Sequence, residues 1–316
     1  MSSKAEQQDL AFQGLREKIP WYISARNAVL RNPNMLIGIV FISLVVILAL
    51  LCPLLIKMGI LRDPFVFDPL NRLLPPGRSE EGDLFLFGTG PLGRDIFSMV
   101  IYGSRISLVV GLSVAIFAAI IGSAIGIIAG YFSRLDDIVM RFMDGIMAIP
   151  GILLAIVLMA ILGPKLENVI FALTVVDAPR TSRIVRSVVL TIRESQYVDA
   201  ANAFGASKTR ILLRHIAPNT FAPVIVQATF LFASAILSEA SLSFLGAGVP
   251  PDIPTSGNII GEGRIYFIGN SNIVILPSLG LFFLALAVNM FGDCLLYTSD
   301  AADEGLGVDL GGRRII

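Results

Sequence analysis

Six long apolar stretches constrain the fold of this 316-residue chain more than any other feature of its sequence. Each approaches the ~20 apolar residues that an α-helix needs to cross a bilayer. Polar segments containing Gly, Pro, Asn and Asp separate them, as turns do. The chain is 55% hydrophobic, with a mean hydropathy of +0.78, which is typical of membrane proteins. We therefore predict an all-α polytopic membrane protein with six transmembrane helices, at residues 35–56, 106–131, 143–162, 169–190, 221–245 and 273–293.

Six spans place both termini on one side of the membrane, and the distribution of Lys and Arg indicates which side. The segments on the N-terminal side carry more basic residues than those on the opposite side, although the loop after the first span also contains four arginines. The positive-inside rule then favours cytoplasmic termini. The predicted organisation is a cytoplasmic segment 1–34, a first transmembrane helix 35–60, an extracytoplasmic segment 61–105, and a core 106–293 that includes a cytoplasmic loop 191–220.

The last 23 residues, 294–316, break the hydrophobic pattern. The segment from Cys294 to Glu304 resembles an in-frame translation of a sequencing-library adapter, and the segment from Gly307 to Ile316 resembles the continuation of that oligonucleotide. We interpret residues 294–316 as foreign sequence, and set them aside from the argument about the fold.

Small residues recur on one face of the second predicted span. Gly122, Gly126 and Gly130 are spaced by four and share a helical face. Small residues let two membrane helices approach closely, because lipid provides no hydrophobic drive for their association. We expect this face to pack against another helix. The fifth span has a looser small face, with Ala233, Ser234, Ser238 and Ser241.

The loop between the fourth and fifth spans, residues 197–219, is a polar island that favours helix formation. Its alanines predict a short helix, and Gly205 can adopt the left-handed conformation that ends one. Ser207 can cap a second helix, which Pro218 would end. Such a unit fits a groove on a partner protein; the alternative is a simple interfacial hairpin.

Charged residues inside spans are costly and tend to face an interior or a cavity. Asp177, Arg180, Arg183 and Arg186 crowd the fourth span, and Glu239 is the only carboxylate in the fifth. Asp177 and Arg180 have the spacing of a helical ion pair. These residues either line a pathway or gate, or form structural ion pairs; for Arg186 we favour the structural interpretation.

Several classes of function lack the residues that they need. His215 is the only histidine, which excludes a multi-histidine zinc site. The zero net charge implies no attraction to nucleic acid. An intramembrane hydrolase needs a nucleophile and a base within the spans, and the single histidine falls in a loop. We expect no catalytic residues, no metal site and no enzyme activity; a membrane scaffold without transport stays a rival.

Many motifs, in one order along residues 35–293, resemble the permease subunits of dipeptide, oligopeptide and nickel ABC importers. The matching residues are Gly88-Thr89, Gly93-Arg94-Asp95, Tyr102-Gly103, Arg105-Ile106-Ser107-Leu108, Asp136, Met140-Arg141, Asp144, Pro150, Arg183, Arg186, Asp199-Ala200-Ala201, Gly205, Pro218, Ser241-Leu242-Ser243-Phe244-Leu245-Gly246, Gly248, Gly257-Asn258, Asn289 and Gly292-Asp293.

The resemblance implies the second of two permease subunits, with one extra helix before a five-helix type I ABC importer core in a bacterial inner membrane. It implies four kinds of partner: a homologous permease subunit, two ATP-binding subunits, a periplasmic solute-binding protein and the lipid bilayer. Its coupling loop to the ATPase would comprise Asp199, Ala200, Ala201, Gly205 and Pro218. The chain has no phosphate-binding loop of the G-x-x-x-x-G-K-[ST] type, so we expect it to bind no cofactor, with ATP used by the partner subunits.

The chain also departs from this family's pattern at five positions. Gly90 stands in place of Asp, Ala178 and Ser256 in place of Trp, Asp199 in place of Glu, and Ala217 in place of Leu. The loss of two interfacial Trp anchors leaves the subclass of solute open. Peptides, nickel, glutathione and opine-like solutes all fit the resemblance.

Overall fold

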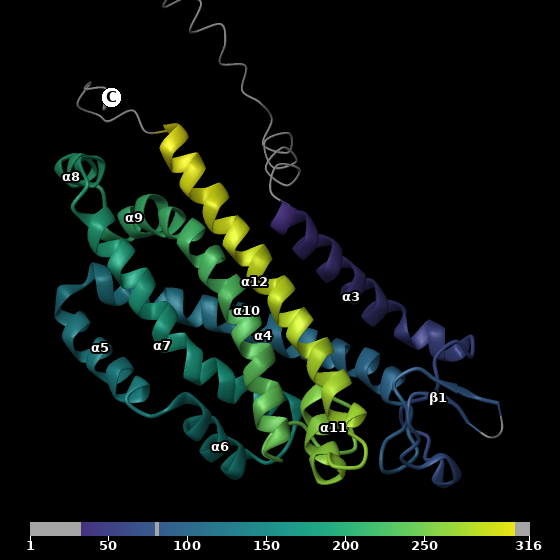
Figure 1. The fold of residues 1–316 in the computed structure, drawn as a ribbon. Coiled ribbons are helices and arrows are strands. Elements are labelled where there is room, and N and C mark those ends of the chain that lie inside the picture. Colours follow the sequence, from purple (N-terminus) through teal and green to yellow (C-terminus); the bar gives the residue numbers. More distant parts are fainter. Residues whose placement is uncertain (1–32, 80–81, 307–316) are drawn as a thin grey trace, which may run out of the picture.

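The computed structural model describes residues 33–79 and 82–306, which form a helical bundle (Figure 1). Its helices are α3 (Pro33–Lys57), α4 (Ile96–Tyr131), α5 (Ser133–Met147), α6 (Gly151–Leu162), α7 (Leu166–Arg193), α8 (Gln196–Ala203), α9 (Lys208–Ile211), α10 (Phe221–Phe244), α11 (Ser256–Gly263) and α12 (Asn272–Leu306). Short 3₁₀ turns lie at Pro69–Asn71, Ala217–Thr220 and Arg264–Tyr266, and a π-helical turn at Leu212–Ile216. Two strands, β1 (Gly77–Arg78) and β2 (Leu84–Phe85), pair antiparallel.

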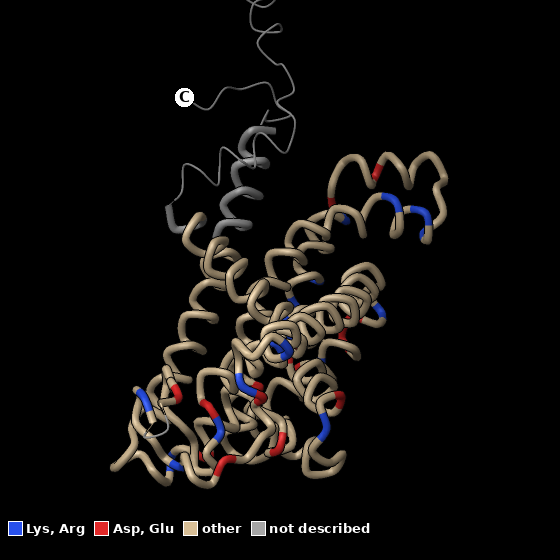
Figure 2. The backbone as a smooth tube through the Cα atoms, turned by 90° about the vertical axis from the view of Figure 1, so that its right-hand side faces the viewer, with Lys and Arg blue, Asp and Glu red and all other residues tan. Residues whose placement is uncertain are grey.

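The bundle has two distinct ends. We call them the α8 end, which holds α8 and α9, and the α11 end, which holds α11 and the β1–β2 hairpin (Figure 1). α4 packs against both α7 and α10, and α12 packs against α10 and α3. α3 runs from the α8 end to the α11 end, and α12 returns (Figure 1). Figure 2 shows charged residues at both ends of the bundle and also along its middle, while the described helices on the left of the view are largely free of them.

Four helical segments within the described residues are long and apolar enough to cross a membrane. They are Leu36–Lys57, Ile96–Tyr131, Lys208–Phe244 and Asn272–Gly292. The pair α5 and α6 makes a fifth if it is taken as one broken span. α7, the predicted fourth span, is 28 residues long but too charged along its length to meet the same test. The all-α membrane fold is confirmed, while the count of six spans stays a prediction.

The predicted continuous span 143–162 is wrong, because the chain turns by 87° between α5 and α6. Pro150 precedes α6 and disfavours the helical conformation for the residue before it. The second span is also longer than predicted and begins at Ile96, where the Asp95 side chain accepts from the backbone N–H of Ser98. The other predicted domain boundaries and the interpretation of residues 294–316 stay predictions; residues 1–32 and 307–316 lie outside the described chain.

The predicted glycine face is confirmed as the contact between α4 and α7. A Cβ atom added at Gly122 would lie 2.6 Å from Cβ of Thr181, and one at Gly126 would lie 2.5 Å from the carbonyl oxygen of Ser182. A Cβ at Gly130 would lie 2.8 Å from Val189. None of these distances leaves room for a methyl group, so only glycine lets the two backbones approach this closely.

We expect Gly126→Val to weaken the α4–α7 contact, because its added methyl groups have no space. Overpacking of this kind costs about 1–3 kcal/mol, so the melting temperature of the purified protein in detergent should fall. Gly145→Val in α5 is the matched control, since a Cβ at Gly145 meets nothing within 4 Å. Equal melting temperatures for the two variants would contradict this assignment.

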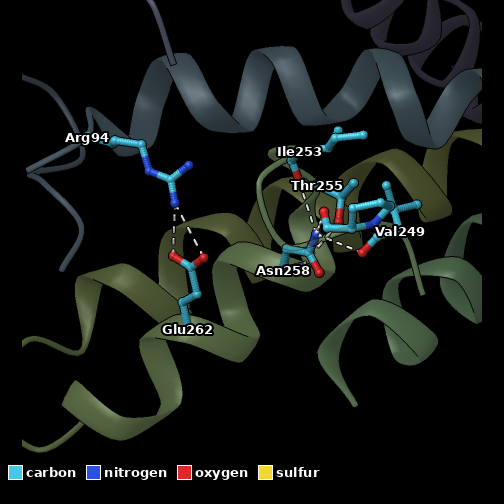
Figure 3. A network of polar contacts seen from close by, with 7 residues as sticks. Arg94, Val249, Ile253, Thr255, Asn258 and Glu262 are labelled. Atoms are coloured by element: carbon cyan, nitrogen blue, oxygen red, sulfur yellow. Dashed lines mark hydrogen bonds and ion pairs between the residues drawn. The ribbon is translucent and has the colours of Figure 1, made fainter. Parts of the chain in front are cut away.

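At the α11 end, two polar contacts fasten α11 to its surroundings (Figure 3). The Arg94 guanidinium donates to both carboxylate oxygens of Glu262, at 3.3 Å each. The side-chain amide of Asn258 donates to the carbonyl oxygens of Val249, Pro250 and Ile253, at 3.0–3.3 Å. α11 is therefore tied both to the start of α4 and to the loop that follows α10.

Burial raises the pKa of the Glu262 carboxyl above 4.5, and the neighbouring Arg94 acts in the opposite direction. A raised pKa means that folding favours the protonated acid, so its contribution to stability is complete below about pH 4.5 and is lost as pH rises through the higher folded-state pKa. We expect wild type and Glu262→Gln to melt alike in acid, and the wild type to lose stability relative to the variant as pH increases.

Melting temperatures measured from pH 4 to pH 8 test this expectation. Glu167→Gln, the same change at an exposed glutamate of α7, controls for the loss of one charge. A wild-type advantage that grows with pH would contradict the sign derived for Glu262.

Candidate functional site

The first part of the predicted loop is a short helix with a rigid end. α8 ends in a Schellman motif, in which the Ala206 N–H donates to the carbonyl of Ala201 and the Gly205 N–H donates to that of Asn202. Gly205 has φ of +75°, as predicted from its lack of a Cβ. Asp199 and Ala200 are exposed. We call Asp199–Gly205 the tip of the loop. The motif fixes the backbone conformation at the end of this tip.

The second part of the loop anchors that tip to the bundle. The Ser207 hydroxyl accepts from the Arg210 N–H at 3.3 Å, which confirms the predicted cap. Val198, Ile211 and Ile216 are fully buried against Val185 and Val189 of α7. This apolar cluster holds the loop on the end of α7.

The prediction that Pro218 ends the second helix is wrong. The backbone continues from α9 through the π-helical turn Leu212–Ile216 and the 3₁₀ turn Ala217–Thr220 into α10. Proline lacks an N–H and disrupts a regular α-helix, but it fits the first turn of a helical segment, and Pro218 lies near the start of the 3₁₀ turn. The loop is thus continuous with α10 as well as with α7.

Phe204 was not among the residues predicted for the coupling loop. Its side chain is 92% exposed at the tip of the loop, beside exposed Asn202 and Ala203. A lone aromatic residue before the turn glycine was the available signal, but the apolar pattern alone does not distinguish a buried anchor from an exposed one. Aromatic residues are enriched at protein–protein interfaces, so Phe204 is a candidate contact for a partner.

The cavity between α6, α7, α10 and α12 is lined in part by polar side chains, and we call it the polar cavity. Its volume is about 470 Å³, within the range of about 300–1,000 Å³ that small-molecule sites occupy. Its walls are largely apolar, and its polar lining consists of Asp177, Arg180, Ser234, Ser238, Ser241 and Asn289. The three serines come from the small-residue face predicted for the fifth span. Asn289 was among the residues that match the family motifs, but it was not predicted to line a pathway.

The four residues predicted to line a pathway have different surroundings in the structure. Asp177 and Arg180 line the cavity, but no ion pair joins them within the described chain, so their predicted pairing is wrong. Arg183 instead donates to Asp144 of α5 at 2.5 Å, with both side chains about half exposed. Glu239 does not line the cavity, and its prediction as a pathway residue stays untested.

Glu239 is fully buried where α10 meets α4. Its carboxylate accepts hydrogen bonds from the hydroxyls of Ser107, at 3.2 Å, and Ser243, at 2.8 Å. The Ser243 hydroxyl also accepts from the Val249 N–H at 3.2 Å. This arrangement matches the alternative interpretation, in which the residue satisfies a helix contact.

Arg186 forms the ion pair that the structural interpretation predicted. Its guanidinium contacts both carboxylate oxygens of Asp136 on α5, at 2.5 and 2.6 Å. The Asp136 side chain is only 14% exposed. Together with Arg183–Asp144, this pair fastens α5 to α7 outside the cavity.

No group of three or more His, Cys, Asp and Glu in the described segments could hold a metal ion. What the arrangement offers is different: apolar helices suited to a bilayer, a polar cavity between them, and a rigid loop at the end of the helices that line the cavity. These features fit the class of membrane permeases.

Comparison with known proteins agrees with this class. Residues 122–302 match the family model described as "Binding-protein-dependent transport system inner membrane component". A putative peptide transport system permease of Brucella suis is 44% identical over 92% of this chain and 94% of its own length. The dipeptide transport system permease DppC of Alkalihalophilus pseudofirmus is 38% identical over 87% and 88%, respectively. The chain therefore belongs to the family of binding-protein-dependent inner-membrane transport components, and is a permease subunit of an ABC importer.

A solved structure shows the same fold. The inward-facing MetNI methionine ABC transporter contains a chain that aligns with a TM-score of 0.54 and 22% identity, over 64% of this chain and 97% of that one. At this identity the likeness concerns the fold alone. It agrees with the predicted type I importer core. As in the rest of this family, ATP is used by separate subunits.

We expect Arg186→Met to destabilise the protein more than Arg183→Met does. Loss of Arg186 leaves the partly buried Asp136 carboxylate without its partner, at a cost of about 1–3 kcal/mol. Loss of Arg183 breaks a more exposed pair, which contributes at most about 1 kcal/mol. Melting temperatures of the two variants in the same detergent test the order. Equal shifts, or the reverse order, would show that burial does not separate these pairs.

Proposed function

We propose that this chain is the second of two permease subunits in a bacterial importer that carries short peptides across the inner membrane. The names of the Brucella and Alkalihalophilus relatives refer to peptides or dipeptides. A relative in Pectobacterium atrosepticum, 38% identical over 69% of this chain, is named for transport of glutathione, which is itself a small peptide. Nickel has less support, because none of these names refers to it.

In the proposed assembly, this chain and a homologous permease enclose the pathway. Two ATP-binding subunits lie on the cytoplasmic side, and a periplasmic solute-binding protein delivers the solute. The α8 end faces the cytoplasm, together with the start of α3 and the end of α12, and the segment 61–105 faces the periplasm. The chain itself catalyses no reaction. Basic residues favour this orientation, since Lys208, Arg210 and Arg214 all lie in the α8–α10 loop.

The observation that carries the proposal is that one loop is continuous with two helices that line the cavity. α7 enters the loop and α10 leaves it, and the polar cavity is lined by both helices. ATP-driven closure of the nucleotide-binding pair would move the tip formed by Asp199–Gly205. Since Val198 and Ile211 are buried against α7, the movement would shift α7 and α10 between two rigid arrangements, inward-facing and outward-facing.

The rival functions account for fewer of these features. A scaffold gives no reason for a polar cavity in the membrane region or for an exposed Phe204. An intramembrane hydrolase needs a base near its nucleophile. His215 instead lies beside Tyr197 in the loop, with ring centroids 6.4 Å apart, and is not part of the cavity lining.

We expect changes at the tip to uncouple transport without unfolding the protein. Gly205→Pro cannot adopt φ of +75°, and Phe204→Asp places a charge where a partner's apolar groove would lie. Ala201→Arg adds bulk to the same helix. Each variant should insert into the membrane normally and lose peptide uptake and transport-coupled ATPase activity by at least about tenfold, which corresponds to 1.4 kcal/mol or more of lost binding.

Ile268→Asp is the matched control for Phe204→Asp, because Ile268 is fully exposed in the short connection between α11 and α12. It should leave coupling to the ATPase intact. In addition, Ala203→Cys should form crosslinks to an ATP-binding subunit in the intact complex. Full uptake by Gly205→Pro and Phe204→Asp, together with no crosslink from Ala203→Cys, would refute the proposed role of the loop.

A further inference from the structure

Asp177 is a buried carboxylate with no hydrogen-bond or ion-pair partner among the described residues. The residue is 6% exposed and lines the cavity between α6, α7 and α10. Within the described chain, neither a hydrogen bond nor an ion pair reaches its oxygens. One turn further along α7, Arg180 lines the same cavity and is likewise unpaired among the described residues.

Other charged residues near Asp177 do have partners, so the lack of a partner is particular to Asp177 and Arg180. Arg183 and Arg186 on the same helix form ion pairs with Asp144 and Asp136 of α5, and Glu239 of α10 accepts two serine hydroxyls. A buried charge without a partner is expensive. Arg180 is exposed, so this cost falls on Asp177 alone. A fold that gives Arg183, Arg186 and Glu239 partners but leaves the Asp177 carboxylate open to a cavity indicates that a solute supplies its partner.

The open charges fit opposite ends of a small zwitterion. Positions three apart on a helix have Cβ atoms about 5–6 Å apart, and the backbone of two residues spans at most about 7 Å. The ammonium group of a dipeptide can therefore meet Asp177 while its carboxylate meets Arg180, whose side chain is long and flexible. Ser234, Ser238 and Ser241 of α10 line the same cavity and offer hydroxyls to the peptide bond.

We propose that Asp177 and Arg180 form a transit site for the two charged termini of a short peptide, with Asp177 binding the ammonium group. This inference rests on the proposed function, since it assigns residues to the passage of peptide solutes. The site lowers the cost of carrying an ammonium group through a region of low dielectric. It discriminates against solutes whose amino terminus is blocked.

Asp177→Asn tests the proposal in the complete importer, reconstituted in proteoliposomes with its partner permease, ATP-binding subunits and solute-binding protein. The probe is radiolabelled dialanine. Loss of a hydrogen bond to a charged group should lower uptake by about tenfold or more, while assembly and basal ATPase activity stay at wild-type levels. Asp177→Glu, which keeps the carboxylate, should restore most of the uptake, and N-acetyl-dialanine should be carried equally by wild type and Asp177→Asn.

Asp137→Asn is the matched control, because Asp137 is exposed on α5 and is not part of the cavity lining. Unchanged dialanine uptake in Asp177→Asn overturns the transit site, and so does a loss of uptake that comes with lost assembly or basal ATPase activity, since the residue would then be structural. Both of these outcomes leave the proposed function standing. A wild-type complex that imports no peptide overturns the proposed function and the transit site together.

Discussion

Close backbone contact between α4 and α7 is the constraint on which the rest of this structure depends. In a bilayer, apolar side chains gain little by leaving lipid for protein, so helices associate through tight packing and polar contacts. Gly122, Gly126 and Gly130 provide the packing, each lying against α7 with no room for a side chain. α7 in turn carries the charges of the cavity, both ion pairs to α5 and the apolar anchor of the loop. Its position determines the geometry of the site.

The features predicted correctly from the sequence are those that local rules determine. The glycine face follows from a spacing of four, the left-handed turn from the absence of a Cβ at Gly205, and the cap from the hydroxyl of Ser207. The errors arise where two local rules compete. At residues 143–162 the apolar pattern favoured one span, but Pro150 interrupts it and the chain turns by 87°. At Pro218 the rule that proline ends a helix failed, because π-helical and 3₁₀ turns accommodate the ring.

Other parts of the site depend on tertiary contacts that a single sequence does not contain. The spacing of Asp177 and Arg180 favoured an ion pair, yet both residues line a cavity whose other walls come from α6, α10 and α12. Likewise, the pattern of the loop does not reveal that Val198 is buried while Phe204, six residues later, is 92% exposed. Val198 is buried because α7 packs against it, whereas no helix of the described chain covers Phe204.

The charged residues of α7 divide according to the side of the helix that they occupy, and the division suits the proposed mechanism. Arg183 and Arg186 hold α5 against α7, so these two helices would move as one body when the loop is displaced. Asp177 and Arg180 form no ion pair with α5 among the described residues, and both line the cavity. A helix that used all four charges in internal ion pairs would offer a zwitterionic solute no compensating charge in the cavity. In the proposed mechanism, Asp177 and Arg180 lack partners within the protein because the transported solute provides them.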